Sequence, residues 1–570
     1  MQKGKRNETE NMLIIVKYVE ENEKRRPRKK LFNKTIFLLS LHLHKREIIM
    51  AKEFNTSVTC DPKKHYMVDV TNKMKVFERL INNGKYFTIT RARQFGKTSS
   101  LKWIYNNLND RYLVVSISFE DTEEDDWISA ATFYKTFCGY MMTAFKNKLL
   151  TKNKEYEKFW NDAKKIENAD IKSLSERITE FCQLSSKKVV LLIDEVDKSL
   201  NNQLFLNFLS MLRKKYIDRD MTGDNSTFWS VVLAGVYDVK NLKLKIRPDE
   251  QHQFNSPWNV AADYDLDMTF NPQEISTMLA DYENDYHFGF DIKGISEEIY
   301  KYTSGYPVLV SRVCKEIDEN LGKDWTKDGV LKAVKKIIKE KRVLSDDITK
   351  NLEIYPKLKA FLRALLLENF SMSFDANNPT LDLANMFSII KEGKGGKVEI
   401  HNLIFQQMLY NYFISENTLN KITVDKGSGI YIDKNGDLDM RVVIDRFAQT
   451  VKKFRNDEKF LEEQGRLLFL CFLKPIINGT GFYYVEPEND DSSRMDIIVN
   501  YHGKEYVIEL KLWYGIEYEI SGRDQIARYI TTRNLSEGYL ITFSFLKNKV
   551  IQEQPEWIEH EGKRIYEAVI

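Results

Sequence analysis

Residues 91–98 carry the side chains needed to bind a nucleoside triphosphate. They follow a β-rich run at 86–90 and lead into a helical stretch, which is the strand–loop–helix context of a Walker A loop. In such a loop Lys97 would neutralise the β- and γ-phosphates, and Thr98 would place its hydroxyl on Mg²⁺. Backbone N–H groups at the start of the helix would hold the phosphates. The sequence therefore predicts an ATP site at this loop.

One position departs from the usual loop pattern, because Arg91 stands where the motif normally begins with glycine. A residue with a Cβ restricts the loop conformation, so the prediction depends on Gly96, Lys97 and Thr98 and on their context. An ordinary strand-to-helix turn is the alternative for this loop taken alone. The residues predicted to bind the nucleotide are Arg91, Arg93, Gln94, Phe95, Gly96, Lys97, Thr98, Ser99, Asp194 and Asp238.

A second motif favours the nucleotide site over that alternative. Residues 189–193 are an uninterrupted apolar run that ends in Asp194 and Glu195. A buried parallel strand delivers its carboxyl end to the ligand crevice, so both carboxylates would emerge beside the phosphates. Asp194 would hold Mg²⁺ through water, and Glu195 would polarise the attacking water as general base. Asp238, which follows a later β-rich run at 229–234, is the predicted γ-phosphate sensor.

The C-terminal part contains a second set of carboxylates beside a lysine. Two β-rich runs flank a turn at 500–504, and a hairpin through that turn brings Asp496 alongside Glu509. Glu509 and Lys511 project from one face, because side chains alternate along a strand. Converging carboxylates form a site for a hard divalent cation, Mg²⁺ or alternatively Mn²⁺. That ion would activate water while Lys511 orients the nucleophile.

Further residues are predicted to complete this second site. Glu462 or Glu463 opens the preceding helix, where a third carboxylate reaches the metal, and Gln525 and Tyr529 share one helix face at i,i+4. The predicted catalytic residues are Glu195, Asp496, Glu509, Lys511, Gln525 and Tyr529. The predicted metal ligands are Thr98 and Asp194 for one ion, and Glu463, Asp496, Glu509 and Leu510 for the other. An amphipathic hairpin with a solvated charged face is the alternative interpretation.

The elements that must position these residues indicate an α/β fold. Short β-rich runs alternate with longer amphipathic stretches up to residue 270, a pattern typical of a mostly parallel sheet. The β-rich runs are 86–90, 112–118, 189–193, 229–234 and 266–270. Residues 272–350 look helical, and 351–420 mix helices with a short hairpin near 393–400. The last part is predicted as a helix at 460–473, a hairpin, another helix and a last strand at 538–545.

Composition supports a globular protein with more than one core. The chain has 570 residues, and 42% hydrophobic and 30% charged residues argue against disorder. Its net charge of +3 comes from residues 1–49, which hold 13 basic and 6 acidic side chains, so the pI does not indicate a basic DNA-binding surface. Five widely spaced cysteines fit free thiols. No apolar run spans a bilayer, so we expect a cytoplasmic protein without membrane contact.

Together the motifs resemble those of bacterial AAA-ATPase-like proteins that carry a C-terminal PD-(D/E)XK nuclease domain. The matching segments are 65–69, 84–89, 91–98, 233–238, 303–310 and 472–479, together with Asp496, Glu509, Leu510 and Lys511. The resemblance implies that Arg91 is a trait of the family loop. It also implies that residues 305–307 correspond to the GxP element of signal-transducing NTPases, which senses nucleotide. It leaves residues 1–49 unmatched, so Met50 is an alternative start.

From the motifs and the resemblance we predict a P-loop NTPase (AAA/STAND-like) domain, a helical and winged-helix-like middle region and a restriction-endonuclease-like α/β domain. The predicted segments are 1–49 (basic extension), 50–270 (ATPase core), 271–350 (helical lid), 351–424 (winged-helix-like region), 425–455 (linker) and 456–570 (nuclease-like domain). Nucleic acid, with DNA preferred, is the expected partner, and a homo-oligomer is compatible with the sequence.

The leading functional prediction is nucleotide-regulated cleavage of nucleic acid, which the resemblance connects with defence or mobile-element biology. A nucleotide-switched scaffold whose nuclease fold binds without cutting is the alternative. A DNA-moving motor ranks last, because no helicase motif or strongly basic tract lies outside the N-terminal segment.

Overall fold

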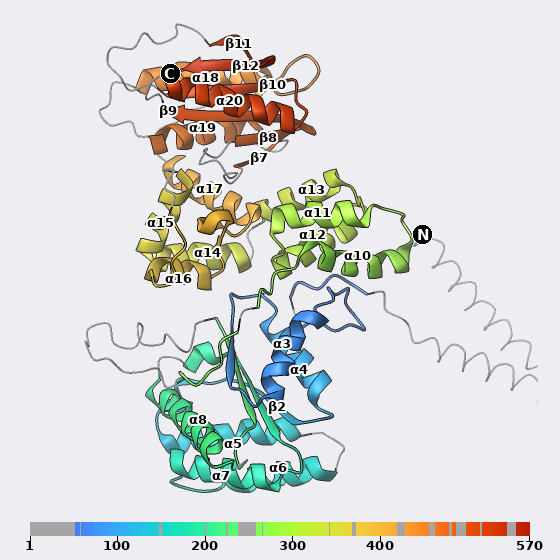
Figure 1. The fold of residues 1–570 in the computed structure, drawn as a ribbon, viewed down its shortest axis with the longest axis vertical. Helices are drawn as coiled ribbons and strands as arrows, with labels where there is room; N and C mark the ends of the chain where they lie inside the picture. The colour runs from blue at the N-terminus through green and yellow to red at the C-terminus, as the bar shows by residue number, and fades with distance from the viewer. Residues whose placement is uncertain are drawn as a thin grey trace, which may run out of the picture. The chain divides into compact units, whose positions relative to one another are not determined.

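The computed structural model describes most of the chain beyond residue 51 (Figure 1). The described ranges are 52–57, 59–146, 151–199, 202–223, 226–236, 258–264, 266–340, 343–367, 372–418, 428–454, 462–477, 481–485, 497–512, 516–543 and 555–570. The chain divides into two units, 1–53 and 54–570, and every element below belongs to the second. The predicted basic extension, 1–49, lies outside the described residues. Within the described ranges no helix is long and apolar enough to cross a membrane.

Four parallel strands form the sheet of the N-terminal half. They are β1 (Phe87–Thr90), β2 (Leu113–Ser118), β3 (Val189–Asp194) and β4 (Ser230–Gly235), in the spatial order β1-β4-β3-β2. Every residue of β3 and β4 is buried, as expected for a parallel sheet covered on both faces. Four of the five predicted strands are confirmed to within one residue at each end.

The helices around this sheet complete two separate hydrophobic cores. They are α3 (Thr71–Asn82), α4 (Lys97–Leu108), α5 (Ala130–Phe145), α6 (Thr151–Lys164), α7 (Ile171–Leu184) and α8 (Gln203–Thr222). Val190 and Leu192 of β3 belong to the core that contains the buried faces of α3 and α4. Leu191 and Ile193 belong to the core shared with α5, α7 and α8. Side-chain alternation along β3 therefore fixes which helices cover each face.

The fifth predicted strand, at 266–270, is wrong, because its described residues form no strand. Their backbone groups are bonded elsewhere: Arg91 donates to the Leu266 carbonyl at 2.6 Å, and the Phe270 N–H donates to the Gly305 carbonyl at 2.8 Å. The Thr269 N–H donates to Asp267 Oδ1 at 2.8 Å. A ladder needs these groups free, so the apolar run becomes an extended connection instead.

A predominantly helical region follows this connection. Its elements are α10 (Pro272–Tyr286), α11 (Ile292–Thr303), α12 (Pro307–Asn320), α13 (Lys327–Lys339), α14 (Val343–Ile354), α15 (Pro356–Leu367), α16 (Pro379–Met386), β5 (Ile390–Glu392), β6 (Val398–Ile400) and α17 (Leu403–Thr418). Asn271 caps α10 by accepting a hydrogen bond from the Glu274 N–H at 2.8 Å, and proline occupies the first helical position. The structure contains the predicted helices, and the hairpin predicted near 393–400 is present as antiparallel β5 and β6.

A six-stranded mixed sheet forms the C-terminal part, in the order β11-β12-β10-β9-β8-β7. The elements are α18 (Met440–Phe454), α19 (Glu462–Ile477), β7 (Phe482–Val485), β8 (Ile497–Tyr501), β9 (Lys504–Leu512), α20 (Ile516–Thr532), β10 (Glu537–Phe543), β11 (Glu556–His560) and β12 (Lys563–Val569). Figure 1 shows α20 crossing the face of this sheet, and it contacts β9, β10 and β12. The predicted hairpin is confirmed as β8 and β9.

Two expectations for this part differ from the structure. The strand predicted at 538–545 is present as β10 but is not the last, because β11 and β12 follow it and β12 pairs with it in parallel. Alternating charges make these two runs resemble a solvated segment in the sequence. Where a linker was predicted over 425–455, residues 440–454 form α18, whose buried apolar stripe packs on β12 and α19.

The α11–α12 turn requires glycine at position 305, because a side chain there would clash with the backbone of Phe270. Gly305 has a φ of +70°, and a Cβ built there would lie 1.9 Å from the Phe270 carbonyl oxygen. Gly322, in the α12–α13 turn, also has a positive φ of +62°, but a Cβ there meets nothing within 4 Å. A substitution at Gly322 therefore causes backbone strain alone, whereas one at Gly305 causes backbone strain and a steric clash.

We expect Gly305→Ala to destabilise the protein more than Gly322→Ala does. Gly322→Ala should cost about 1 kcal/mol, because only the left-handed backbone is penalised. Gly305→Ala should cost at least about 2 kcal/mol more, because the backbone at Phe270 must move. Urea unfolding followed by circular dichroism measures both, and equal losses would contradict the tight packing at Gly305.

Candidate functional site

The loop between β1 and α4 has the conformation of an anion-binding turn. Gly96 is the N-cap of α4 and has a φ of +83°, and Gln94 is exposed with a φ of +58°. Lys97 is 7% exposed, and its ammonium donates to the Arg91 and Ala92 carbonyls, both at 3.1 Å. The side chain thus folds back over the loop that precedes it. A phosphate seated at the start of α4 would meet this ammonium and free helix N–H groups.

Thr98 and Asp194 meet at the carboxyl edge of the parallel sheet. The Thr98 hydroxyl donates to Asp194 Oδ2 at 2.7 Å, although the two residues are 96 positions apart in the sequence. Asp194 Oδ1 accepts from the N–H of Glu195 at 2.9 Å. A hydroxyl and a carboxylate in contact are the oxygen donors that a Mg²⁺ ion prefers. These residues therefore fit the nucleotide-bound Mg²⁺ that the sequence predicts.

Three carboxylates surround Lys97 and set the electrostatics of the site. Burial lowers the pKa of Lys97, and Asp197, Glu195 and Asp194 oppose that shift in this order of strength. Burial raises the pKa of Glu195; Lys97 opposes this shift, whereas Asp194 and Asp197 reinforce it. Glu195 also has a φ of +54° at the end of β3. A carboxylate with a raised pKa beside the phosphate position has the properties of a general base.

Asp197 is a site residue that the sequence reasoning missed. Its Oδ2 accepts from the Val236 N–H at 2.6 Å, and its side chain lies so close to Gly235 that a Cβ there would be 2.8 Å from Oδ1. Asp197 therefore joins the end of β3 to the end of β4 and also opposes the charge of Lys97. The sequence does contain a hint of its role, because Asp197 is a third acidic residue shortly after Asp194 and Glu195.

The two arginines of the loop are bonded to other parts of the chain. The Arg91 guanidinium donates to the carbonyls of Thr90 at 2.7 Å and Leu266 at 2.6 Å, so it fastens the connection after β4. The Arg93 guanidinium is exposed and lies 3.6 Å from Asp347 of α14. Arg91 thus fixes the loop structurally.

Arg91 also faces a cavity of about 1080 Å³ on the side of β1 away from β4. Ser304, Lys391 and His401 line it as well. The Lys391 ammonium donates to the Ser304 hydroxyl at 3.2 Å, and burial lowers the pKa of Lys391. The cavity therefore brings together the loop, the α11–α12 turn and the β5–β6 hairpin without including Lys97 or Thr98.

Aromatic contacts connect the loop to the helical region. Phe95 packs edge-on against Tyr306, with ring centroids 4.8 Å apart, and His401 lies 5.4 Å from Tyr306. The Tyr306 hydroxyl donates to the Arg93 carbonyl at 3.1 Å. Burial lowers the pKa of His401 to about 4, so this ring is neutral near pH 7.

Ser99, the next loop position after Thr98, accepts from the Cys60 N–H at 3.4 Å.

The C-terminal sheet holds a second cluster of buried charged residues. The Lys511 ammonium lies 2.9 Å from Glu509 Oε1 and donates to Gln525 Oε1 at 2.7 Å. Glu509 is 0% exposed and Gln525 is 1% exposed. The cluster forms because Glu509 and Lys511 share the β9 face beneath α20, while Leu510 is buried on the opposite face. Glu509 offers carboxylate oxygens of the kind that hard divalent cations prefer, and Lys511 already neutralises part of their charge.

The structure describes some of the remaining predicted site residues and not others. Tyr529 is half-buried on α20 and packs against the core, one turn from Gln525. Glu463 lies in the first turn of α19. Asp496 and Asp238, the predicted γ-phosphate sensor, lie outside the described residues. The described ladder of β8 and β9 pairs Ile497 with Ile508, adjacent to the position of Glu509.

We expect Lys97→Ala to weaken nucleotide binding by at least about tenfold, the equivalent of one charge-assisted hydrogen bond. Lys102, on the same helix, is the matched control, because its ammonium is partly exposed and 3.6 Å from Asp61. Lys102→Ala should leave binding unchanged. Titration with a fluorescent ATP analogue measures both, and unchanged affinity in Lys97→Ala would contradict the assignment of the loop.

Comparison with known proteins agrees with the loop and sheet geometry. Residues 56–383 match the family described as an AAA-like domain. No curated protein matches the sequence significantly. Among solved structures, a Walker-type ATPase of Pyrococcus abyssi is similar at 14% identity and a TM-score of 0.44, over 62% of this chain and 99% of that one. The ORC2 protein of Aeropyrum pernix is similar at 11% identity and a TM-score of 0.38, over 64% of this chain and 98% of that one.

Both structural similarities are too distant to assign a ligand or partner to this chain. The family match, in contrast, extends over more than half of the 570 residues. It includes the loop that holds Lys97, the strand that ends in Asp194 and the helices that follow them. The protein therefore belongs to the AAA-like domain family.

Proposed function

We propose that this protein binds and hydrolyses ATP and uses its C-terminal domain for metal-dependent cleavage of nucleic acid, with DNA as the preferred substrate. The observation that carries the ATP half is the contact of Thr98 with Asp194 beside the buried ammonium of Lys97. The buried group of Glu509, Lys511 and Gln525 supports the nuclease half. Both groups would act on phosphate oxygens, which is the chemistry that they share.

In the ATP site each residue has a separate task. Lys97 would exchange its loop carbonyls for the β- and γ-phosphates, so that an internal hydrogen bond is replaced by a charge-assisted one. Thr98 and Asp194 would hold Mg²⁺, which would neutralise charge on the phosphates. Glu195 would take the proton of the attacking water, since burial and neighbouring acids raise the pKa of its carboxyl group.

In the nuclease-like site the side chains are held by one another. Gln525 accepts from Lys511 and so keeps its ammonium beside Glu509. When bound, Mg²⁺ or Mn²⁺ would lower the pKa of a water molecule and provide the hydrolytic nucleophile. Glu509 would hold the ion together with Asp496, Glu463 and Leu510, and Lys511 would orient the water. Tyr529 lies on α20 one helical turn from Gln525 and would contact the nucleic-acid substrate.

A second candidate function is a nucleotide-switched protein that binds nucleic acid without cutting it. It is favoured by the direct ion pair between Lys511 and Glu509, because a lysine that neutralises the carboxylate competes with a metal ion. The leading proposal includes a setting in defence or mobile-element biology, which depends on the family resemblance. It is also compatible with assembly as a homo-oligomer.

ATP hydrolysis should depend on pH through Glu195. Since the pKa of this carboxyl group is raised, it becomes protonated at a higher pH than an ordinary glutamate, and its function as base is lost as the pH falls through that value. We expect an acidic limb in the rate profile above the ordinary value of 4.5. Glu195→Gln should bind ATP but hydrolyse it at least about 100-fold more slowly. Phosphate release measured from pH 5 to 9 tests this, and normal turnover by Glu195→Gln would exclude Glu195 as the base.

Cleavage should require Glu509 and a divalent metal. We expect Glu509→Gln to reduce cutting of DNA or RNA with Mg²⁺ or Mn²⁺ by at least about 100-fold, because an isosteric amide cannot hold the ion as a carboxylate does. Glu559→Gln, an exposed glutamate of β11, is the matched control and should cut normally. The assay should be run on single- and double-stranded substrates, with and without ATP.

Three outcomes distinguish the candidates. Cleavage by the wild type that Glu509→Gln abolishes supports the nuclease, and dependence on ATP supports coupling to the Lys97 site. Binding of nucleic acid without cleavage by the wild type supports the second candidate. Equal cleavage by the wild type and Glu509→Gln would contradict the assigned site.

A further inference from the structure

Three consecutive residues of α20 reach three different elements of the C-terminal sheet. Arg523 contacts Glu567 of β12 at 2.6 Å, and Gln525 accepts from Lys511 of β9. Asp524, between them, reaches the end of β11, where its Oδ1 lies 2.6 Å from Nε2 of His560. Successive helical residues point about 100° apart, so one helical turn can contact several strands at once. Asp524 therefore faces a surface that neither neighbour uses.

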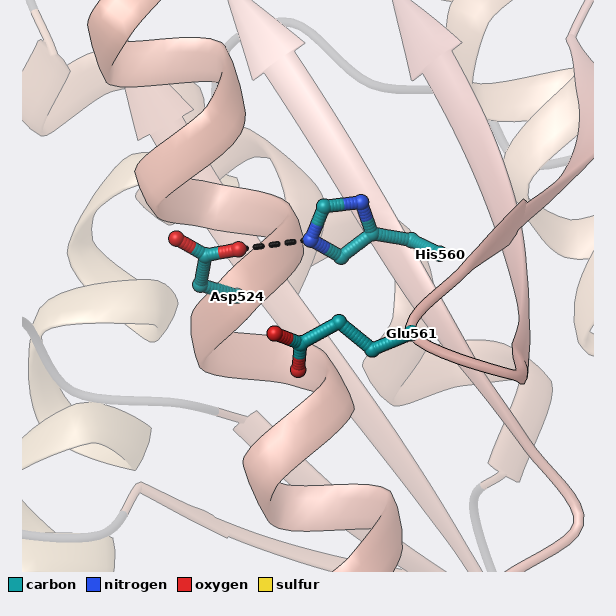
Figure 2. Close-up of side chains that lie close together, drawn as sticks. All are labelled: Asp524, His560 and Glu561. Atoms are coloured by element: carbon teal, nitrogen blue, oxygen red, sulfur yellow. Dashed lines mark hydrogen bonds and ion pairs between the residues drawn. The ribbon is translucent and has the colours of Figure 1, made fainter.

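A third side chain completes this surface. Glu561 follows His560 in the turn between β11 and β12, and one ligand atom from each of Asp524, His560 and Glu561 lies within 4.8 Å of the other two. Figure 2 shows the Asp524 carboxylate on the helix facing the imidazole and the Glu561 carboxylate on the hairpin. Two carboxylates and an imidazole nitrogen thus converge from two elements.

The cluster holds two carboxylates and one imidazole, which carries a charge only when it is protonated. Within the described residues, His560 is the sole basic partner of Asp524, and no lysine or arginine forms an ion pair with Asp524 or Glu561. Converging carboxylates repel each other unless a positive charge lies between them. A plain Asp524–His560 ion pair would need only two of the three groups and leaves the approach of Glu561 without a partner.

We propose that Asp524, His560 and Glu561 bind a borderline divalent transition-metal ion, for which Zn²⁺ is the reference. An imidazole nitrogen with two carboxylate oxygens is a donor set that Zn²⁺ accepts and that Mg²⁺, which prefers oxygen alone, does not favour. Three protein ligands leave at least one coordination position to water. The site differs in its ligands from both phosphate-directed sites described above.

Metal binding here would fasten the β11–β12 hairpin to α20. The hairpin lies at the edge of the sheet, and α20 carries Gln525, which holds Lys511. An ion bound by both elements would stabilise their contact, since a ligand that binds the folded form alone raises its stability by mass action. The inference does not depend on whether Glu509 and Lys511 cleave nucleic acid.

Isothermal titration of Zn²⁺ into the full chain, in excess Mg²⁺ to occupy oxygen-only sites, tests the proposal. We expect one binding event in the wild type that His560→Ala weakens at least about tenfold, because losing a ligand should cost no less than losing an outer-shell partner. His502, in the β8–β9 turn, is the matched control, since it is a histidine of another hairpin in the same sheet. His502→Ala should bind Zn²⁺ normally.

Glu561→Gln separates metal binding from a simple ion pair. Glu561 is exposed in a turn, so its substitution leaves the core and the Asp524–His560 contact intact. The proposal requires that this variant also bind Zn²⁺ at least about tenfold more weakly and lose the rise in melting temperature that Zn²⁺ gives the wild type. Binding that survives both His560→Ala and Glu561→Gln would come from other groups, such as the free cysteines, and would overturn the proposal, as would a wild type that binds no Zn²⁺.

Discussion

A buried ammonium at the carboxyl edge of a parallel sheet is the constraint on which the N-terminal half depends. Lys97 is almost fully enclosed, and an unpaired charge in that position would cost several kcal/mol. Loop carbonyls and the carboxylates of Asp194, Glu195 and Asp197, at and after the end of β3, offset that cost. These groups reach Lys97 because the carboxyl ends of parallel strands share one edge of the sheet, where Asp197 also accepts from the Val236 N–H after β4. The same arrangement leaves the ammonium ready to exchange its carbonyls for phosphate oxygens.

The C-terminal sheet handles a buried lysine in a similar way. Lys511 is enclosed beneath α20 and is held by one carboxylate and one amide instead of by backbone carbonyls. Because α20 supplies that amide, its position against the sheet decides whether Lys511 and Glu509 stay together. Arg523 and Asp524 add contacts from α20 to the β11–β12 hairpin, beside the packing of α20 on β9 and β10.

The nucleotide loop is also joined to the helical region by direct contacts. Tyr306 bonds to the backbone of Arg93, and Phe95 packs against Tyr306. Tyr306 follows Gly305, whose missing side chain lets the α11–α12 turn approach the connection after β4. A change in the loop conformation would therefore alter the packing of this turn and of His401 beside it. This gives the proposed nucleotide control a physical route that begins at the phosphate position.

The sequence by itself determined the strands β1 to β4, the loop around Lys97, the acids after β3 and the hairpin of Glu509 and Lys511, because each depends on local periodicity or a short motif. Tertiary structure decided the rest. The run at 266–270 is apolar enough for a strand, yet Arg91 and Gly305 take the hydrogen bonds that a ladder needs. β11 and β12 carry too much charge to stand out, and parallel pairing of β12 with β10 joins residues far apart in the chain. Asp197 and His560 acquire their neighbours only through packing, since no spacing rule connects them to Gly235 or Asp524.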